Sequence, residues 1–339
     1  MPRVRASKPL TSPSLPVPLL VQRPLYANPT DASSEWLAVS DGHELHVRRS
    51  GALDGLPVLV LHGGPGSGCS PLLARCFDPR RYRVICVDQR GAGLSRPHGE
   101  IAHNTTTHLL ADLRALRRHL GVSQWLVVGG SWGATLALAH AIDAPDAVSA
   151  LLLRGLFLAR AQDVAHFFDA AAHGRPQAWE VYERHAAEWH CPLIEALYRV
   201  LCEGTPAERN ALALHWWRWE HFVAAGTEPP PPDADAVRVL VGRYRIQSHY
   251  LRELCWLDQP PMLERCAALR RVPTLLLHGT QDAVCAPTGA AALHARLLHS
   301  ELRWVQGAGH DPTHPGMVDA TVRALDAYAA YGHFGDGAA

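Results

Sequence analysis

The stretch WLVVGGSWGATLALAHA, residues 125–141, decides the fold. It begins as an apolar run of the kind that forms a buried strand and ends in an alanine- and leucine-rich helical pattern. Between the two, GGSWG (129–133) matches the G-x-S-x-G pattern of a sharp strand-to-helix turn. Such a turn requires small residues two positions before and two positions after the serine, and glycine occupies both. We therefore expect Ser131 to project above the sheet as a nucleophile.

A nucleophilic serine needs backbone N–H groups that stabilise the oxyanion formed when it attacks a carbonyl. The loop HGGPG (62–66) follows an earlier apolar run, where the fold would place one such donor. The N–H groups of Gly64 and Trp132 are the expected pair, and the helix that follows the serine adds its positive dipole end. The loss of one such donor typically costs ~3 kcal/mol of transition-state stabilisation.

The acid and the histidine of a catalytic triad should follow the serine in that order, each after a late strand. The apolar run 274–278 ends in GTQD, and the run 302–305 leads into GAGH. Asp282 and His310 are therefore the expected acid and general base, with Asp282 fixing the tautomer of the imidazole. Asp311 competes for the acid role, but an adjacent residue cannot easily reach that imidazole from another strand.

Short apolar runs alternate with helical patterns through much of the chain, which predicts a doubly wound, mostly parallel sheet. A β-hairpin around the Asp41-Gly42 turn is expected to open it. The predicted buried strands are 57–62, 82–88, 124–129, 147–153, 274–279 and 302–305.

The middle of the chain differs, because residues 159–268 show helical spacing without a strand signal. We expect a helical cap there, inserted between two core strands and placed over the carboxyl ends of the sheet. The core is then formed by residues 26–158 and 269–339. Residues 1–25, which contain six prolines, are expected to be a flexible extension.

Charge and composition narrow the classes of partner. The 32 basic and 32 acidic residues cancel, so nothing favours nucleic acid or an anionic membrane surface, and a small-molecule partner is expected. The eight cysteines show no C-x-x-C spacing, which fits reduced thiols in a cytoplasm. Uninterrupted apolar runs stay shorter than ~18 residues, so no membrane span is expected. Without an H-E-x-x-H pair or clustered cysteines, we expect no metal and no cofactor.

Five segments resemble the proline iminopeptidases, also called prolyl aminopeptidases: HGGPGSGCSP (62–71), FDPRRYRVICVDQRGAGLSRPH (77–98), NTT (104–106), GGSWGATLALAHA (129–141) and LRGLF (153–157). The resemblance extends over about residues 25–335. These α/β-hydrolases remove an N-terminal proline from peptides, so it implies an α/β-hydrolase fold and peptide substrates. It also places the family's triad on Ser131, Asp282 and His310.

In that family, substrate recognition lies largely in the cap. One glutamate follows a W-x-x-W pair, which corresponds here to Trp216, Trp219 and Glu220. Glu220 is therefore the implied anchor for the substrate amine, and Trp219 is an implied substrate-binding residue. A second family glutamate, in an A-R-I-E-x-H-Y-F segment, is replaced here by Gln247. An amide oxygen still accepts a hydrogen bond but brings no charge. Packing within the cap is an alternative role for some of the tryptophans at 216, 217 and 219.

The resemblance also implies an apolar pocket for the proline ring. Phe157 matches the family, and Phe167 keeps an aromatic side chain at another position of this pocket. Leu251 replaces a family aromatic residue, which leaves the pocket roomier.

Two other functions remain open from the sequence. An esterase or amidase would use the same triad if Gln247 and Leu251 have removed the recognition of the amine. A non-catalytic binding protein could share the fold, although all triad positions and both glycine loops are present. A dehalogenase or epoxide hydrolase would carry aspartate instead of Ser131.

Overall fold

A single eight-stranded sheet forms the centre of the computed structural model, which describes residues 22–29, 32–169, 177–297 and 299–335. The strand order is β1-β2-β4-β3-β5-β6-β7-β8. β1 and β2 form an antiparallel hairpin, β2 is also antiparallel to β4, and the remaining pairs are parallel. The strands are β1 (Ser33–Ala38), β2 (Glu44–Gly51), β3 (Leu56–Leu61), β4 (Tyr82–Val87), β5 (Trp125–Gly130), β6 (Val148–Arg154), β7 (Thr274–Gly279) and β8 (Ser300–Val305).

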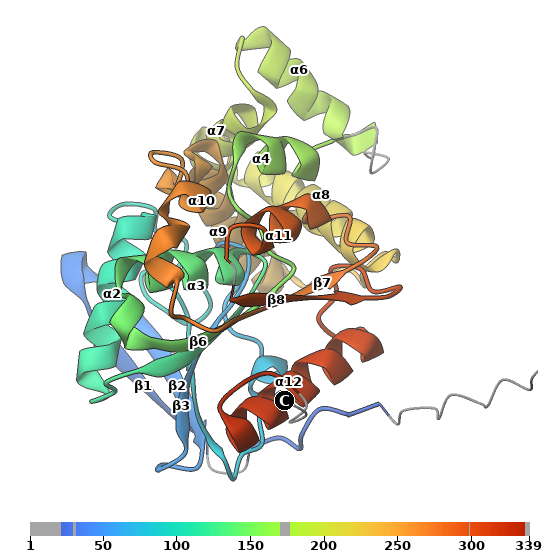
Figure 1. The fold of residues 1–339 in the computed structure, drawn as a ribbon. Helices are drawn as coiled ribbons and strands as arrows, with labels where there is room; N and C mark the ends of the chain where they lie inside the picture. Colours follow the sequence, from blue (N-terminus) through green and yellow to red (C-terminus); the bar gives the residue numbers. More distant parts are fainter. Residues whose placement is uncertain (1–21, 30–31, 170–176, 298, 336–339) are drawn as a thin grey trace, which may run out of the picture.

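Helices connect these strands and cover the sheet (Figure 1). The helices are α1 (Pro71–Ala74), α2 (Thr106–His119), α3 (Trp132–Asp143), α4 (Ala161–Phe167), α6 (Glu180–Glu188), α7 (Leu193–Glu203), α8 (Pro206–Ala225), α9 (Ala234–Arg252), α10 (Met262–Arg265), α11 (Pro287–His294) and α12 (Pro315–Tyr331). Short 3-10 helices lie at Ser40–Gly42, Pro145–Ala147, Gln177–Trp179, Leu254–Trp256 and Cys266–Leu269. Among the described helices, none combines the length and the apolar character that a membrane span requires.

The central strands are buried on both faces, which explains their nearly continuous apolar sequences. In β3, Leu59 and Leu61 belong to the larger core cluster, together with side chains of α2, α3 and the cap. The alternate residues Val58 and Val60 belong to a second cluster with side chains of α12. Because side chains alternate along a strand, one apolar run contributes to both cores.

The predicted strands are confirmed, with small differences at their ends. The largest is in β8, which starts at Ser300 instead of 302. This strand lies at the edge of the sheet and only Val305 is buried, so its first residues carry no apolar signal. The predicted hairpin is also present, and its turn places Asp41 and Gly42 at positive φ, 61° and 75°.

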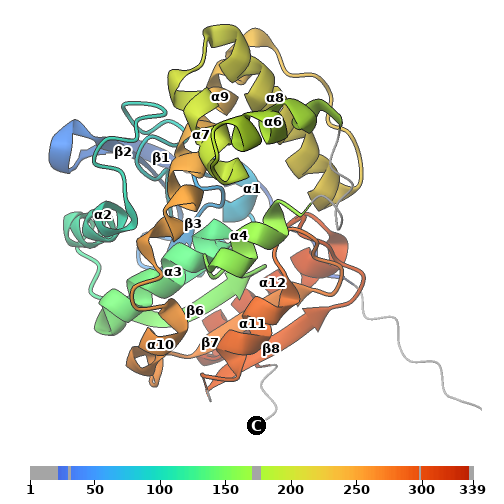
Figure 2. The same ribbon diagram turned by 90° about the horizontal axis from the view of Figure 1, so that it is seen from above.

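Between β6 and β7, in the segment expected to form the cap, the regular elements of the described residues are all helices. Their ends carry clear signals: Thr205 and Glu208 form a capping box at the start of α8, and Asp233 caps α9. In Figure 2, α6, α7, α8 and α9 gather at one end of the molecule, away from α11 and α12. Most of the expected N-terminal extension, residues 1–21, lies outside the described part of the chain.

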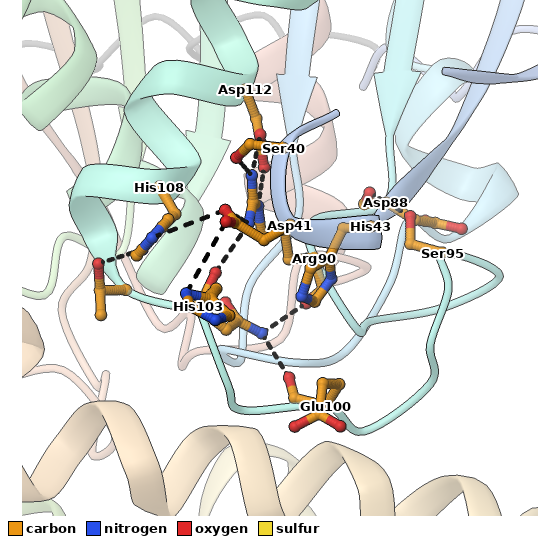
Figure 3. A network of polar contacts seen from close by, with 12 residues as sticks. Ser40, Asp41, His43, Asp88, Arg90, Ser95, Glu100, His103, His108 and Asp112 are labelled. Carbon is orange, nitrogen blue, oxygen red and sulfur yellow. Dashed lines mark hydrogen bonds and ion pairs between the residues drawn. The ribbon is translucent and has the colours of Figure 1, made fainter. Parts of the chain in front are cut away.

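Arg90 ties the hairpin turn to helix α2 (Figure 3). Its guanidinium is buried and makes two hydrogen bonds to the Asp112 carboxylate, at 2.6 and 2.8 Å. The same group donates to the Ser40 hydroxyl at 2.7 Å and to the backbone oxygen of His103 at 2.8 Å. A buried arginine with this many acceptors fixes the segment DQRGAG (88–93) that follows β4.

His140 gives the fold a predictable acid sensitivity. It is fully buried in α3, where its Nε2 accepts a hydrogen bond from the Trp125 indole, and burial lowers its pKa to about 4. The unfolded chain binds this proton near pH ~6.5, so stability is lost as the pH falls from there toward 4. We expect His140→Leu to reduce the loss of unfolding free energy between pH 7 and 5 by about 2 kcal/mol, measured by urea titration. The half-exposed His119, changed to leucine, serves as the control, and equal pH slopes for wild type and His140→Leu would contradict the assignment.

Candidate active site

Ser131 sits in the turn between β5 and α3 with a backbone conformation that few non-glycine residues adopt, φ 57° and ψ −127°. The surrounding chain leaves no room for side chains at the two outer glycines. A Cβ on Gly129 would lie 2.2 Å from the Gly133 oxygen, and one on Gly133 would lie 2.2 Å from the Leu61 oxygen. The turn is therefore held by close backbone packing against β3, which forces the serine out of the sheet.

Asp282 and His310, which follow β7 and β8, are hydrogen-bonded to each other at 2.8 Å through Oδ2 and Nδ1. The other carboxylate oxygen accepts from the backbone N–H groups of Val284 and Cys285, at 3.0 and 2.9 Å. Burial opposes ionisation of this carboxyl, but the charge and hydrogen bond of His310 outweigh it and lower the pKa of Asp282. The acid is therefore an oriented carboxylate that holds Nδ1 of the imidazole.

Ser131 and His310 line one cavity of about 270 Å³ between the core and the cap. None of the hydrogen bonds among the described residues joins the two side chains; the Ser131 hydroxyl instead lies 4.0 Å from the Cys285 thiol. Catalytic hydrogen bonds are often long without substrate and shorten when it binds. The three residues expected from the sequence thus converge, with the serine and the imidazole facing the same space.

The two expected oxyanion donors lie beside this serine. Trp132 is the first residue of α3, so its N–H has no acceptor within the helix. Gly64 lines the cavity at φ 116°, and a Cβ on the neighbouring Gly63 would lie 3.5 Å from that of Ser131. Among the described residues, no group accepts a hydrogen bond from the N–H of Gly64 or of Trp132.

The motif after β4 positions this loop. Gln89 donates from its backbone N–H to His62 Nε2 and from its amide to the His62 oxygen, both at 3.0 Å. Its amide oxygen accepts from the Trp132 indole at 2.7 Å. One buried glutamine therefore connects the glycine loop to Trp132, the residue after Ser131, so the segments DQRGAG and GGSWG are in direct contact.

The cap contributes a cluster of polar side chains to the cavity from two neighbouring helices. Glu220, on α8, accepts hydrogen bonds from the Arg243 guanidinium, the Tyr244 hydroxyl and the Gln247 amide, all on α9. Glu220, Arg243 and Gln247 line the cavity, whereas Tyr244 is fully buried behind them. Burial disfavours the guanidinium charge, but Glu220 and Tyr244 together outweigh it and raise the pKa of Arg243.

The apolar part of the cavity contains Phe157, Phe167 and Leu251, as the resemblance implies. Trp219 does not line it, contrary to the expectation that it binds substrate. Its side chain is 1% exposed and packs against Phe167, with ring centroids 5.1 Å apart, because its position on α8 faces the interior of the cap. Trp217 lines the cavity instead.

Besides Trp217, several residues in or beside the site were not predicted from the sequence, among them Arg154, Gly155, Cys285 and Arg243. Arg154 donates to the His310 backbone oxygen at 2.9 Å and its own oxygen accepts from the Ser131 N–H. A signal existed for Cys285, which lies three residues after Asp282, and for Arg154 and Gly155 in the segment LRGLF. Arg243 carried none, because its role depends on how α8 and α9 pack.

Among the described residues, three possible metal ligands come within 4.8 Å of one another at Asp41, His103 and His108 (Figure 3). Arg90 lies 3.5 Å from the Asp41 carboxylate and already provides a positive charge there. None of these side chains lines the cavity that contains Ser131. The cluster is therefore explained by the Arg90 network.

Comparisons with known proteins agree with this architecture. The family described as alpha/beta hydrolase fold matches residues 57–314. A putative epoxide hydrolase from Pseudomonas aeruginosa superposes with a TM-score of 0.60 over 91% of this chain and 97% of its own, at 21% identity. The protein is an α/β-hydrolase.

Sequence relatives define the family more closely. A probable proline iminopeptidase of Leptolyngbya boryana is 37% identical over 91% of this chain and 98% of its own length. The proline iminopeptidase of Xanthomonas citri is 38% identical over 91% of this chain and its full length. A proline iminopeptidase-related protein from Thermus thermophilus has a TM-score of 0.54 at 25% identity, over 88% of this chain and 98% of its own. The chain belongs to the proline iminopeptidase family.

Gly155 provides a test of how tightly the acid and the histidine are held. A Cβ there would lie 3.1 Å from Asp282 Oδ2 and 3.2 Å from the His310 ring, at a φ of 51°. We expect Gly155→Ala to displace this pair and to lower kcat/KM about ten- to a hundredfold, measured on any substrate that the enzyme turns over. Gly307→Ala is the matched control, because Gly307 has φ 71° and open space at its Cβ. Equal losses of activity in both variants would point to backbone strain alone.

Proposed function

We propose that this protein is a serine exopeptidase that releases N-terminal proline from peptides, with Ser131, His310 and Asp282 as its catalytic triad. The observation that carries this proposal is the oriented His310–Asp282 pair, which meets the strained Ser131 turn in one cavity beneath the cap. The names of the sequence relatives support the choice of substrate.

The reaction proceeds in two halves. Ser131 Oγ attacks the carbonyl carbon of the first residue while its proton passes to Nε2 of His310, since Asp282 holds Nδ1. The N–H groups of Gly64 and Trp132 stabilise the oxyanion. The imidazolium then donates its proton to the leaving amine, which leaves an acyl-enzyme at Ser131. Water, activated by the same histidine, hydrolyses the ester and releases the free amino acid.

The cap selects the acyl group in this mechanism. The proline ring lies against Phe157, Phe167 and Leu251, and its nitrogen faces Glu220 and Gln247. The chain beyond the scissile bond leaves through the open side of the cavity. A free N-terminus is then required because the α8–α9 polar cluster closes the site behind the first residue.

One observation favours a second candidate, an esterase or amidase of broader substrate range. The Glu220 carboxylate already has three donors, including a guanidinium, so it is not a free anchor for a substrate amine. Such an enzyme would use the same triad.

An anilide series distinguishes the candidates. We expect Pro-4-nitroanilide to have a higher kcat/KM than Ala-4-nitroanilide and acetyl-Pro-4-nitroanilide, because the acetyl group would meet the polar cluster that closes the site. Ser131→Ala should abolish both turnover and labelling by a fluorophosphonate, read by mass spectrometry. Equal turnover of the acetylated compound would favour the second candidate. A folded wild-type protein that takes no label would support a non-catalytic binding protein.

The carboxylates of Asp282, which is hydrogen-bonded to His310, and of Asp311, which follows His310 in the chain, have different expected roles. Asp282→Asn should lower kcat by about 10⁴-fold, because an amide in this place favours the wrong imidazole tautomer. Asp311→Asn should change kcat by less than about threefold, since the Asp311 carboxylate bonds Thr313 at the surface. Stopped-flow or steady-state kinetics on one prolyl substrate measures both. A large effect at Asp311 would reverse the assignment of the acid.

A further inference from the structure

Both carboxylate oxygens of Glu220 are already hydrogen-bonded, and an arginine compensates the charge of this carboxylate. Glu220 Oε2 is occupied by the Arg243 guanidinium and by the Tyr244 hydroxyl at 2.9 Å. Its Oε1 accepts from the Gln247 amide at 3.1 Å. The carboxylate is thus compensated by a cation that lines the same cavity, with side-chain exposures of 17% for Glu220 and 23% for Arg243.

The orientation of Gln247 follows from the same contacts. A carboxylate only accepts hydrogen bonds, so the Gln247 NH₂ group must face Glu220 and its oxygen must point the other way. That oxygen is buried and has no hydrogen-bond donor among the described residues. Gln247 is 2% exposed and lines the cavity, so a residue of the cavity wall carries a buried acceptor without a donor. An unmade buried hydrogen bond is costly, and a substrate N–H group would satisfy it.

The charges around this acceptor do not favour a cation. The cavity is lined by one glutamate and two arginines, Arg154 from β6 and Arg243 from α9. Its titratable lining groups also include His221 on α8 and His310, while the Asp282 carboxylate is engaged by His310. An ammonium placed against Gln247 would therefore meet an ion pair and not a free carboxylate. A guanidinium close by favours the deprotonated form of an amine.

We propose that this cavity receives the α-nitrogen of the substrate as an uncharged N–H donor to Gln247 Oε1, with Arg243 as the residue that sets this specificity. This inference rests on the proposed function. The substrate class is accordingly an acyl group with a five-membered ring whose nitrogen is neutral, including N-terminal proline in its deprotonated form. Arg243 acts by neutralising Glu220, and Gln247 by accepting the N–H.

A pH profile tests this with a single substrate, because the amine of a prolyl anilide loses its charge without changing its shape. The amine of a peptide N-terminus titrates near pH ~8, and that of Pro-4-nitroanilide is measured directly by titration. We measure kcat/KM from pH 6.5 to 9.5 and divide it by the rate constant for fluorophosphonate inactivation, which follows the triad but carries no amine. We expect this ratio to rise as the amine deprotonates and to level off above its pKa, because only the uncharged amine is bound. A ratio that stays level across this titration would contradict the inference.

The outcomes separate the inference from the function on which it rests. A cation-binding site would make the ratio fall about tenfold per pH unit above the pKa of the amine, and a fall that follows this titration overturns the inference alone. Absence of prolyl turnover in a protein that still takes the fluorophosphonate label rejects the proposed function, and the inference with it.

Two variants should reverse the preference for the uncharged amine if Gln247 accepts the N–H and Arg243 neutralises Glu220. Gln247→Glu restores a carboxylate opposite the nitrogen, and Arg243→Met removes the compensating charge from Glu220. In each variant, we expect the ratio to fall at least about tenfold across the titration of the amine, as expected when a charge-assisted hydrogen bond replaces a neutral one. Arg238→Met removes a charge from the same helix at a side chain that is 74% exposed, and should keep the wild-type profile. If Arg243→Met does not fold, Gln247→Glu alone is sufficient for the test. A folded Gln247→Glu protein whose ratio depends on pH as in the wild type contradicts the proposal.

Discussion

The close approach of backbone at the strand-to-helix turn after β5 is the constraint on which the rest of the site depends. Gly133 packs so tightly against the end of β3 that a methyl group would overlap the Leu61 oxygen. The same contact holds Ser131 at a positive φ and brings the glycine loop after β3 beside it. A strained backbone persists only where the surroundings fix it, and here the surroundings are two adjacent strands of the sheet. Ser131 and the glycine loop that contains Gly64 are consequently positioned by the same backbone contact.

Buried polar side chains connect the serine turn to the segments around it through hydrogen bonds. Gln89 connects the His62 loop with the Trp132 indole, and Arg90 connects the hairpin turn with α2. Both residues follow β4, whose carboxyl end lies next to that of β3 in the sheet. Hydrogen bonds in such a low-dielectric environment stabilise a unique arrangement, because each lost partner leaves a buried polar group unsatisfied. The core thus provides a rigid base, on which the cap places its own side chains.

The cap determines the charge that the cavity presents to a ligand. A free glutamate in the cavity would attract an ammonium, whereas a glutamate paired with Arg243 presents little net charge. The energy of a charge near the surface of a cavity depends strongly on whether its partner is already present. In the proposed function, two helices of the cap, α8 and α9, therefore determine which acyl groups reach Ser131. The chemistry of bond cleavage and the recognition of the substrate are set by separate parts of the chain.

The amino-acid sequence by itself determined the order of strands and helices, the serine turn, and the positions of the acid and histidine, because these depend on local periodicity, glycine placement and chain order. It also indicated the residues of the apolar pocket through a family resemblance. The tertiary structure decided the rest: that Trp219 packs inside the cap while Trp217 lines the cavity, that Cys285 lies beside the serine, and that Arg243 neutralises Glu220. The physical reason is that the periodicity of a helix, which can be read from the sequence, shows only which of its residues lie on the same face. Whether that face meets an opposite charge, an aromatic core or the substrate depends on how distant helices pack.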